Sequence, residues 1–252
     1  MTLLITGGAS GIGAATARLA AQRGHKVAIN YRSRDAQANK VVADITAKGG
    51  QAVALPADVS READIVRLFD AAEKALGPIT HLVNSAGIGL NARVADFDAA
   101  ALDRLFTVNT VGLMLCCREA ARRMSTKRGG KGGVVVNVSS MAGTIGGRPG
   151  ASAYAASKAA VDSFTMGFAK DVALEGIRAV SLRPGMIETE MTEKTLSDRE
   201  TRAAIESTIA MGRVGQAQEI ANAIVWLLSD EASFISGVTL DASGGGFVFG
   251  KR

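Results

Sequence analysis

A tyrosine and a lysine four residues apart have the side chains needed for acid–base chemistry. Tyr154 and Lys158 stand at the start of a segment with helical periodicity, and residues four apart lie on one face of a helix. A free phenol has a pKa of about 10, so it exchanges protons poorly at neutral pH unless its anion is stabilised. A fixed ammonium nearby would lower that pKa. The spacing therefore predicts that Lys158 assists Tyr154 as an acid–base group.

Two serines end an apolar run upstream of this pair. Val134 to Val138 read as a buried strand, and Ser139 and Ser140 follow it directly. Open α/β sheets bind ligands beyond the carboxyl ends of their strands. The hydroxyl groups are therefore candidate ligand contacts, or else they cap the end of the strand.

A glycine-rich loop lies near the N-terminus. Thr6 to Gly13 read Thr-Gly-Gly-Ala-Ser-Gly-Ile-Gly, between the first apolar run and the first helical segment. Repeated glycines let the backbone approach a pyrophosphate, and the start of the helix offers free N–H groups. Gly13, inside the helix, would let the helix pack close to the strand. No Gly-Lys-Ser/Thr follows, so the loop predicts a dinucleotide site rather than an ATP-type P-loop.

The end of the second apolar run indicates which dinucleotide is bound. NAD-binding folds usually place an acid there for the ribose hydroxyls, but this chain has Asn30-Tyr31-Arg32-Ser33. Asp35 is read as a helix cap. Arg32 would neutralise a 2′-phosphate, which favours NADP over NAD, although NAD stays possible. The alternative is that Arg32 is a solvated surface residue.

Strands and helices alternate along the whole chain and must position these groups. The predicted strands are Thr2 to Thr6, Lys26 to Tyr31, Gln51 to Pro56, Ile79 to Asn84, Gly133 to Ser139, Ile177 to Arg183 and Val238 to Asp241. The predicted helices are Ile12 to Arg23, Asp35 to Lys48, Arg61 to Leu76, Leu102 to Thr126, Ser152 to Leu174 and Ala217 to Ser229. This alternation predicts one α/β domain over residues 1–252. Its fold is a doubly wound Rossmann-type fold, with a central parallel sheet of about seven strands and helices on both faces.

One polar segment interrupts the alternation. Residues 186–212 are charged and rich in threonine and follow a strand. Long insertions at this edge of a sheet often cover the ligand crevice. The segment is therefore interpreted as a substrate lid, with a surface excursion as the alternative.

Composition excludes several classes of protein. Of 252 residues, 47% are hydrophobic and 21% charged, and the 29 glycines show no three-residue repeat. Disorder and collagen are therefore excluded, and no run approaches the roughly 20 apolar residues of a membrane span. The adjacent Cys116 and Cys117 suit reduced thiols in the cytoplasm. His25 and His81 are isolated, so no metal is predicted.

A basic stretch leaves an alternative open. Six basic residues fall between positions 118 and 131, and Glu119 is the only acid among them. They would bind an acidic partner, such as a carrier protein, or would complement the dipole at the end of a helix. Aromatic residues make up only 4% of the chain, which argues against nucleic acid.

Together these motifs resemble the short-chain dehydrogenase/reductase family, in the single-domain branch that includes 3-oxoacyl carrier-protein reductases and bacterial glucose dehydrogenases. The resemblance covers almost the whole chain. It implies a catalytic four of Asn109, Ser140, Tyr154 and Lys158. The cofactor contacts that the motifs and the resemblance together predict are Gly7, Ser10, Gly11, Ile12, Gly13, Tyr31, Arg32, Ser33, Asp58, Val59, Asn84, Ala86, Gly87, Tyr154, Lys158, Pro184, Gly185, Ile187 and Thr189.

The resemblance implies hydride transfer between a nicotinamide and a carbonyl or alcohol carbon. Tyr154 would exchange the proton, Ser140 would orient the substrate oxygen, Lys158 would bind the nicotinamide ribose, and Asn109 would anchor a proton-relaying water. Sugars and oxoacyl thioesters are both candidate substrates, and a dinucleotide sensor without turnover is the alternative from another class. The resemblance also implies a homotetramer that pairs the helices around Leu102 to Thr126 and Ser152 to Leu174, with Gly244 to Phe249 as a tail available to a neighbouring subunit.

Overall fold

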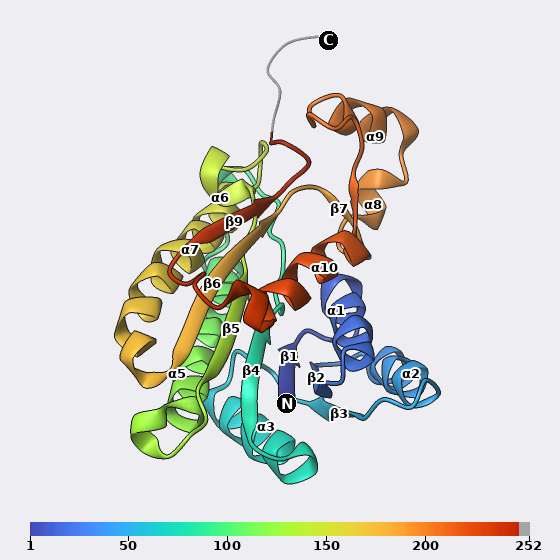
Figure 1. The fold of residues 1–252 in the computed structure, drawn as a ribbon. Helices are drawn as coiled ribbons and strands as arrows, with labels where there is room; N and C mark the ends of the chain where they lie inside the picture. The colour runs from blue at the N-terminus through green and yellow to red at the C-terminus, as the bar shows by residue number, and fades with distance from the viewer. Residues whose placement is uncertain (247–252) are drawn as a thin grey trace.

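Seven parallel strands form the central sheet, in the order β3-β2-β1-β4-β5-β6-β9 (Figure 1). The computed structural model describes residues 1–246, so Phe247 to Phe249 of the expected tail lie outside the described residues. The strands are β1 (Thr2–Thr6), β2 (Lys26–Tyr31), β3 (Ala52–Pro56), β4 (Ile79–Asn84), β5 (Gly133–Val138), β6 (Ile177–Pro184) and β9 (Thr239–Ala242). This confirms the predicted fold, and each predicted strand lies within a residue or so of its position.

Helices cover both faces of the sheet. The helices of the main body are α1 (Gly11–Gln22), α2 (Asp35–Thr46), α3 (Glu62–Leu76), α4 (Ala99–Phe106), α5 (Leu113–Met124), α6 (Ala142–Ile145), α7 (Ser152–Val172) and α10 (Ala217–Leu228). Residues of α3, α5 and α7 form one buried core, and residues of α1, α2 and α10 form the other.

The apolar runs are continuous because each strand supplies both cores. In β1, Leu4 belongs to the core under α3, α5 and α7, whereas Leu3 and Ile5 belong to the core under α1, α2 and α10. Successive side chains of a strand point to opposite faces, so a strand buried on both sides needs an apolar residue at every position. The strand order reverses between β1 and β4, which is where open α/β sheets bind their ligands.

The helix expected from Leu102 to Thr126 is longer and less regular than predicted. It begins at Ala99, and a π-helical turn, Thr107–Gly112, separates α4 from α5. A Cβ on Gly112 would lie 2.2 Å from the carbonyl oxygen of Val59. The glycine therefore allows this turn to touch the loop after β3, a contact that sequence periodicity does not reveal.

The same continuous helix corrects the expectation about apolar segments. Ala99–Met124 is 26 residues long, with a mean hydropathy of 1.3, and is long and apolar enough to span a membrane by length and composition alone. Leu113, Cys116, Cys117, Ala120 and Met124 are instead packed in the core beneath the sheet. A core helix passes the same test, so its composition carries no membrane assignment.

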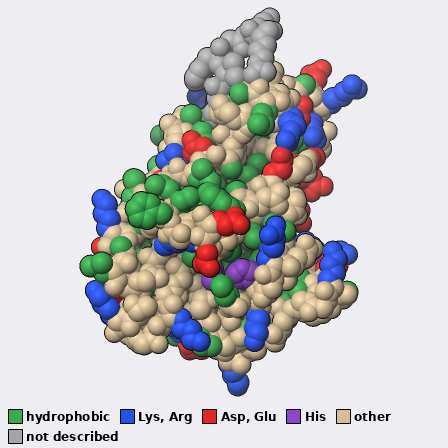
Figure 2. Space-filling view, viewed as in Figure 1, with side chains coloured by type: hydrophobic (Ala, Val, Ile, Leu, Met, Phe, Trp, Pro, Cys, Tyr) green, Lys and Arg blue, Asp and Glu red, His purple; other side chains and the backbone are tan. Residues whose placement is uncertain are grey.

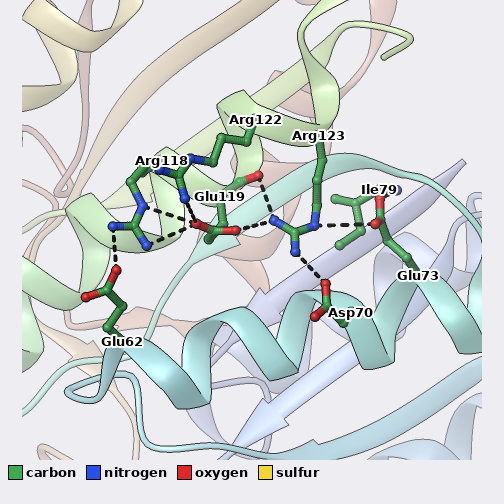
Figure 3. Close-up of polar contacts among 8 residues, drawn as sticks. All are labelled: Glu62, Asp70, Glu73, Ile79, Arg118, Glu119, Arg122 and Arg123. Carbon is green, nitrogen blue, oxygen red and sulfur yellow. Dashed lines mark hydrogen bonds and ion pairs between the residues drawn. The ribbon is translucent and has the colours of Figure 1, made fainter. Parts of the chain in front are cut away.

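The first half of the basic stretch is neutralised within the protein (Figure 3). Glu119 is almost fully buried and pairs with Arg118 (3.0 Å), Arg122 (2.9 Å) and Arg123. Arg123 also reaches Asp70 of α3 at 2.6 Å. These contacts fasten α5 to α3, so three of the six cations act inside the fold and are not free for an acidic partner.

The segment 186–212 folds mainly as short pieces. It contains β7 (Ile187–Glu188), α8 (Glu193–Leu196) and α9 (Arg199–Glu206), and β7 pairs with β8 (Gly215–Gln216). A small apolar cluster of its own, Leu196, Ile205, Ile209 and Val214, lies apart from the two main cores. Figure 1 shows α9 at the opposite end of the molecule from the N-terminus.

Candidate active site

A cavity of about 820 Å³ lies beyond the carboxyl ends of the strands, within the range of about 300–1,000 Å³ usual for ligand sites. Loops after β1, β2, β3, β4, β5 and β6 line it. Most of the predicted site residues share its wall: Gly7, Ser10, Gly11, Ile12, Tyr31, Arg32, Ser33, Asp58, Val59, Ala86, Gly87, Ser140, Tyr154, Lys158, Pro184, Gly185, Ile187 and Thr189. Gly13, Asn84 and Asn109 do not line it.

The glycine loop packs so closely against its neighbours that its backbone forms part of the cavity wall. Gly7 has a φ of +67°, and a Cβ there would lie 2.8 Å from the Cα of Ala86. A Cβ on Gly13 would lie 2.3 Å from the carbonyl oxygen of Gly7. Gly13 therefore closes the helix onto its own loop and does not itself face the cavity. Exposed backbone at the start of α1 suits a pyrophosphate, so the loop fits the implied dinucleotide.

The loop after β2 lines the cavity with Tyr31, Arg32, Ser33 and Arg34. Arg32 is exposed and makes no ion pair with the described residues. Asp35 does not cap α2 as expected, because it is the first residue of the helix, after Arg34 at the N-cap position. Its carboxylate accepts a hydrogen bond from the Tyr31 hydroxyl (2.8 Å). No acid therefore stands at the end of β2 itself.

Asp58 lies in the loop after β3. Its carboxylate accepts hydrogen bonds from the Ser60 hydroxyl (2.7 Å) and from Arg104 (3.0 Å). Burial alone would raise the pKa of Asp58, but these hydrogen bonds outweigh it and hold the pKa below its ordinary value. Arg104 also lines the cavity, and the sequence analysis missed it because it lies in α4, 46 residues from its partner.

The loop after β4 is held by groups behind the wall. Ala86 and Gly87 face the cavity, whereas Asn84 is buried and donates to the side-chain oxygen of Asn137 at 2.9 Å. The Thr6 hydroxyl accepts from the backbone N–H groups of Ser85 and Ala86, both at 3.2 Å. Asn84 therefore acts on the site through its neighbours.

Ser140, Tyr154 and Lys158 come together from the end of β5 and the start of α7. The Lys158 ammonium is buried, donates to the carbonyl oxygen of Val138 at 2.9 Å and lies 5.9 Å from the centre of the Tyr154 ring. The Ser139 hydroxyl donates to the carbonyl oxygen of Lys158 at 2.9 Å. Of the two serines, Ser139 thus secures α7 to β5, and Ser140 is the one hydrogen-bonded to Tyr154.

The protonation of this pair differs from the sequence-based expectation. Burial raises the pKa of Tyr154, and the hydrogen bond from Ser140 only partly opposes this rise. Burial also lowers the pKa of Lys158 to about 8, despite the opposing charge of Asp162. Burial and Ser140 therefore account for the shift of the Tyr154 pKa, and the ammonium of Lys158, 5.9 Å from the ring centre, is not among its causes.

Asn109 stands behind the wall, in the π-helical turn. Its side-chain oxygen accepts from the N–H of Ile88 (2.8 Å), and its amide donates to the carbonyl oxygen of Ile88 (2.9 Å) and to the Ser157 hydroxyl (3.1 Å). Asn109 thus links the loop after β4 to α7, the helix that carries Tyr154 and Lys158. π-helical turns often occur at functional sites.

The loop after β6 closes the other side. A Cβ on Gly185 would lie 2.9 Å from the Cα of Ser243, and one on Gly11 would lie 3.2 Å from the Cγ2 of Thr189. This loop therefore faces the glycine loop at close range. Glu190 pairs with Arg34, which ties the segment 186–212 to the rim of the cavity. This pair joins residues 156 positions apart, and no sequence motif indicates it.

The cavity also has apolar side chains in its wall. Its lining includes Ile88, Leu90, Asn91, Met141, Ala142, Ile145, Arg148, Met186 and Met191. Among residues 1–246, no group of three or more His, Cys, Asp or Glu side chains could hold a metal ion.

Comparison with known proteins finds a matching family model and similar oxidoreductases. A family model described as "Enoyl-(Acyl carrier protein) reductase" matches residues 7–246. The chain is 45% identical to "Uncharacterized oxidoreductase YgfF" of Escherichia coli (strain K12), over 96% of this chain and 98% of that protein. It is 37% identical to "NADPH-dependent aldehyde reductase-like protein, chloroplastic" of Arabidopsis thaliana, over 96% and 92%.

A solved structure agrees with these relatives. A dehydrogenase/reductase from Sinorhizobium meliloti 1021 superposes with a TM-score of 0.90 at 34% identity, over 97% of this chain and 94% of that one. The family model, the two relatives and the solved structure each match nearly the whole chain. The chain therefore belongs to the short-chain dehydrogenase/reductase family of NAD(P)-dependent oxidoreductases.

Proposed function

We propose that this protein is an NADP-dependent oxidoreductase that interconverts a carbonyl compound and its alcohol. The observation that carries this proposal is that Ser140, Tyr154 and Lys158 share one cavity with the glycine loop. A dinucleotide sensor would have no need to gather these three side chains. Family membership indicates the reaction class, and the side chains gathered in the cavity are the candidate catalytic groups.

The cofactor contacts follow the wall of the cavity. Gly7, Ser10, Gly11 and Ile12 would hold the pyrophosphate, Asp58 and Val59 the adenine, and Ala86, Gly87 and the loop from Pro184 to Thr189 the nicotinamide half. Arg32 and Ser33 would hold a 2′-phosphate, since no acid ends β2. When bound, the reduced nicotinamide would supply the hydride that forms the new C–H bond.

The chain's own groups would handle the oxygen and its proton. Ser140 would hydrogen-bond the substrate oxygen, and Tyr154 would give that oxygen a proton in reduction or take it in oxidation. The raised pKa makes the phenol a weaker acid, so proton transfer would depend on groups that stabilise its anion, and Ser140 and Lys158 are the candidates. Lys158 would bind the nicotinamide ribose. Asn109 would anchor the relay water while its bonds to Ile88 position the loop after β4.

We further propose that residues 186–212 form a lid and that the enzyme is a cytoplasmic homotetramer. Six residues of this segment already line the cavity: Met186, Ile187, Thr189, Glu190, Met191 and Thr192.

The exposed apolar surface supports the tetramer. Figure 2 shows hydrophobic side chains gathered on one face, and the exposed apolar residues near α10 and β9 are Trp226, Phe234, Val238 and Leu240. Val111 and Met166 are exposed on the helices expected to pair. Two apolar faces give two interfaces, as a tetramer of closed symmetry needs, and light scattering at four chain masses would test it.

Turnover with a carbonyl panel tests the proposed reaction. Oxoacyl thioesters, sugars, steroids, quinones and small aldehydes are supplied with NADPH or NADH, and nicotinamide absorbance is followed. Tyr154→Phe should lower turnover by about 10²-fold or more while leaving the dissociation constant of NADPH within about twofold, because the lost hydroxyl group acts on the substrate. Tight NADPH binding without turnover on any compound would favour the sensor instead.

A further inference from the structure

We propose that Arg148 binds an anionic group of the substrate, so that the enzyme acts on carbonyl compounds that also carry a carboxylate or a phosphate. This inference rests on the proposed function, because it concerns the substrate end of the same cavity. It names a specificity-determining residue and a chemical class of substrate.

Other cations on the wall are already engaged. Arg104 pairs with Asp58 at 3.0 Å, and Arg34 pairs with Glu190. Lys158 is buried and donates to a backbone carbonyl. Neither arginine is available to an anion without breaking an ion pair, and Lys158 lies in the catalytic group itself.

Arg32 and Arg148 differ from these cations. Each lines the cavity, is exposed and has no carboxylate partner among the described residues. Arg32 lies in the loop after β2, on the side where the cofactor's 2′-phosphate is proposed. Arg148 is therefore the unpaired cation available to the substrate in the part of the chain that the structure describes.

The backbone places Arg148 at the catalytic end. It belongs to the connection between α6 and α7, residues 146–151, in the segment that leads from Ser140 to Tyr154, and its carbonyl oxygen accepts from the N–H of Ala151 at 2.9 Å. The opposite loop is attached to the same connection, because Ala92 donates to the carbonyl oxygen of Gly150 at 2.9 Å. Both attachments fix the main chain and leave the guanidinium free to move.

The present partner of the guanidinium is weak. Arg148 donates to the Thr208 hydroxyl at 3.4 Å, which is a long bond to a neutral acceptor. A carboxylate or phosphate would offer a charged, two-pronged acceptor, and such hydrogen bonds are about twice as strong as neutral ones. An anion would therefore displace Thr208 with a net gain.

Apolar side chains share the cavity wall with Arg148 and the catalytic side chains, and they limit what can join the two groups of the substrate. Ala142 and Ile145 line the cavity from α6, Met141 lines it from the position just before α6, and Met186 and Met191 line it from the proposed lid. Apolar walls favour an apolar spacer, and methionine adapts to several shapes. The inferred substrate thus has a carbonyl group at one end, an apolar body and an anionic group at the other end.

Matched pairs of aldehydes test the inference by turnover. Succinic, adipic and suberic semialdehydes are compared with their methyl esters, and glyceraldehyde phosphate with glyceraldehyde, each with NADPH. We expect kcat/KM for at least one anion to exceed that of its neutral partner by about tenfold or more. Arg148→Met should reduce this preference about tenfold, chiefly by raising KM for the anion. The carboxylate and phosphate arms identify which anion the site takes.

Two controls make the result specific. Arg93→Met removes an exposed arginine that does not line the cavity and should leave the anion preference at its wild-type value. Arg148→Lys should retain part of the preference, because it keeps the charge but loses the planar fork. An anion preference that is absent in the wild type, or equal in wild type and Arg148→Met, would overturn the inference while leaving the proposed reaction in place.

A binding measurement separates the two proposals. Suberate carries no reducible carbonyl, so calorimetry reports the anion site without turnover. Binding that weakens about tenfold in Arg148→Met would support the site even if no aldehyde were reduced, a result that would overturn the proposed reaction alone. Suberate binding that Arg148→Met leaves unchanged, or no suberate binding at all, would overturn the anion site.

Discussion

Asn84 at the end of β4 donates a hydrogen bond to Asn137 of β5 at 2.9 Å, deep inside the sheet. Asn137 in turn donates to the Thr165 hydroxyl of α7 at 2.9 Å. On the other side, the Thr6 hydroxyl donates to the side-chain oxygen of Asn84 at 3.5 Å and accepts from the loop after β4. A buried series of hydrogen bonds thus connects the glycine loop, the loop after β4 and α7.

Asn137→Ala should both destabilise the protein and loosen the site. Truncation leaves the Asn84 amide with only the weak acceptor Cys117 Sγ at 3.4 Å and removes the donor to the Thr165 hydroxyl, which costs about 2–3 kcal/mol of unfolding free energy. We also expect the dissociation constant of NADPH to rise several-fold. Urea unfolding and cofactor fluorescence measure the two effects. Asn39→Ala, on the exposed face of α2, should change neither the stability nor the affinity for NADPH. If Asn137→Ala were as stable as the wild type, the hydrogen bonds of Asn137 would not have the role proposed here.

Arg32→Asp should reverse part of the cofactor preference. An acid at the end of β2 repels a 2′-phosphate and accepts hydrogen bonds from a free ribose. We expect the ratio of kcat/KM for NADPH over NADH to fall by about tenfold or more. Arg23→Asp, at the exposed end of α1, serves as the control. An unchanged ratio in Arg32→Asp would make Arg32 a solvated surface residue.

Lys158→Met should yield a more stable but inactive enzyme. Burial lowers the pKa of Lys158 from 10.5 to about 8, so keeping the charge in the fold costs about 3 kcal/mol at neutral pH. Methionine avoids that cost but leaves the Val138 carbonyl without its donor, a loss of about 1 kcal/mol. The net gain at neutral pH is about 2 kcal/mol.

The pH dependence of that variant is a sharper test. The unfolded chain binds the Lys158 proton more tightly than the folded protein, so wild-type stability rises from pH 8 to 10.5. Lys158→Met should lack this rise, as measured by urea unfolding across the range. Lys170→Met, exposed on the same helix, should retain it. A variant less stable than the wild type at neutral pH would contradict the cost of burial.

His81 should make the fold sensitive to acid. Its ring is buried in β4, its Nε2 lies 3.2 Å from the Leu228 carbonyl oxygen, and the ring of His25 stands 5.1 Å away. Burial first, and then the charge of His25, lower its pKa from 6.5 to about 4. The unfolded chain therefore takes up this proton first, and stability falls by about 3 kcal/mol as the pH drops through that interval.

His81→Gln isolates that contribution, because it keeps a donor for Leu228 but does not titrate. Its unfolding free energy should fall less than that of the wild type between pH 6.5 and about 4. Comparison above pH 7, where His81 is neutral in both states, gives the cost of the substitution itself. Parallel curves over the acid range would show that His81 does not contribute.

The sequence predicted best the groups that lie at or just after the ends of strands. Short sequence motifs indicate the loops after β1, β2 and β6 and the pair Tyr154 and Lys158. A parallel sheet brings the carboxyl ends of its strands to one edge, and the motifs with them. Their placement on one wall follows from the topology, whereas the roles assigned to them stay predictions for the experiments above.

Long-range partners and burial could not be read from sequence. Arg34 and Glu190 are far apart in the chain, as are Asp58 and Arg104, and neither pair belongs to a motif. The raised pKa of Tyr154 depends on how much protein surrounds the phenol, which spacing does not report. The two hydrogen bonds between the side chain of Asn109 and the backbone of Ile88 join residues 21 positions apart, and no motif indicates them.

The π-helical turn also sets the angular phase between the two halves of its helix. Each residue of an α-helix advances the chain by about 100° around the axis. A one-residue deletion within Thr107–Gly112 would regularise the turn and swing all of α5 by that angle. Cys116, Cys117 and Met124 would then leave the core, and Arg123 would leave Asp70 of α3. Natural length variation should therefore avoid this turn.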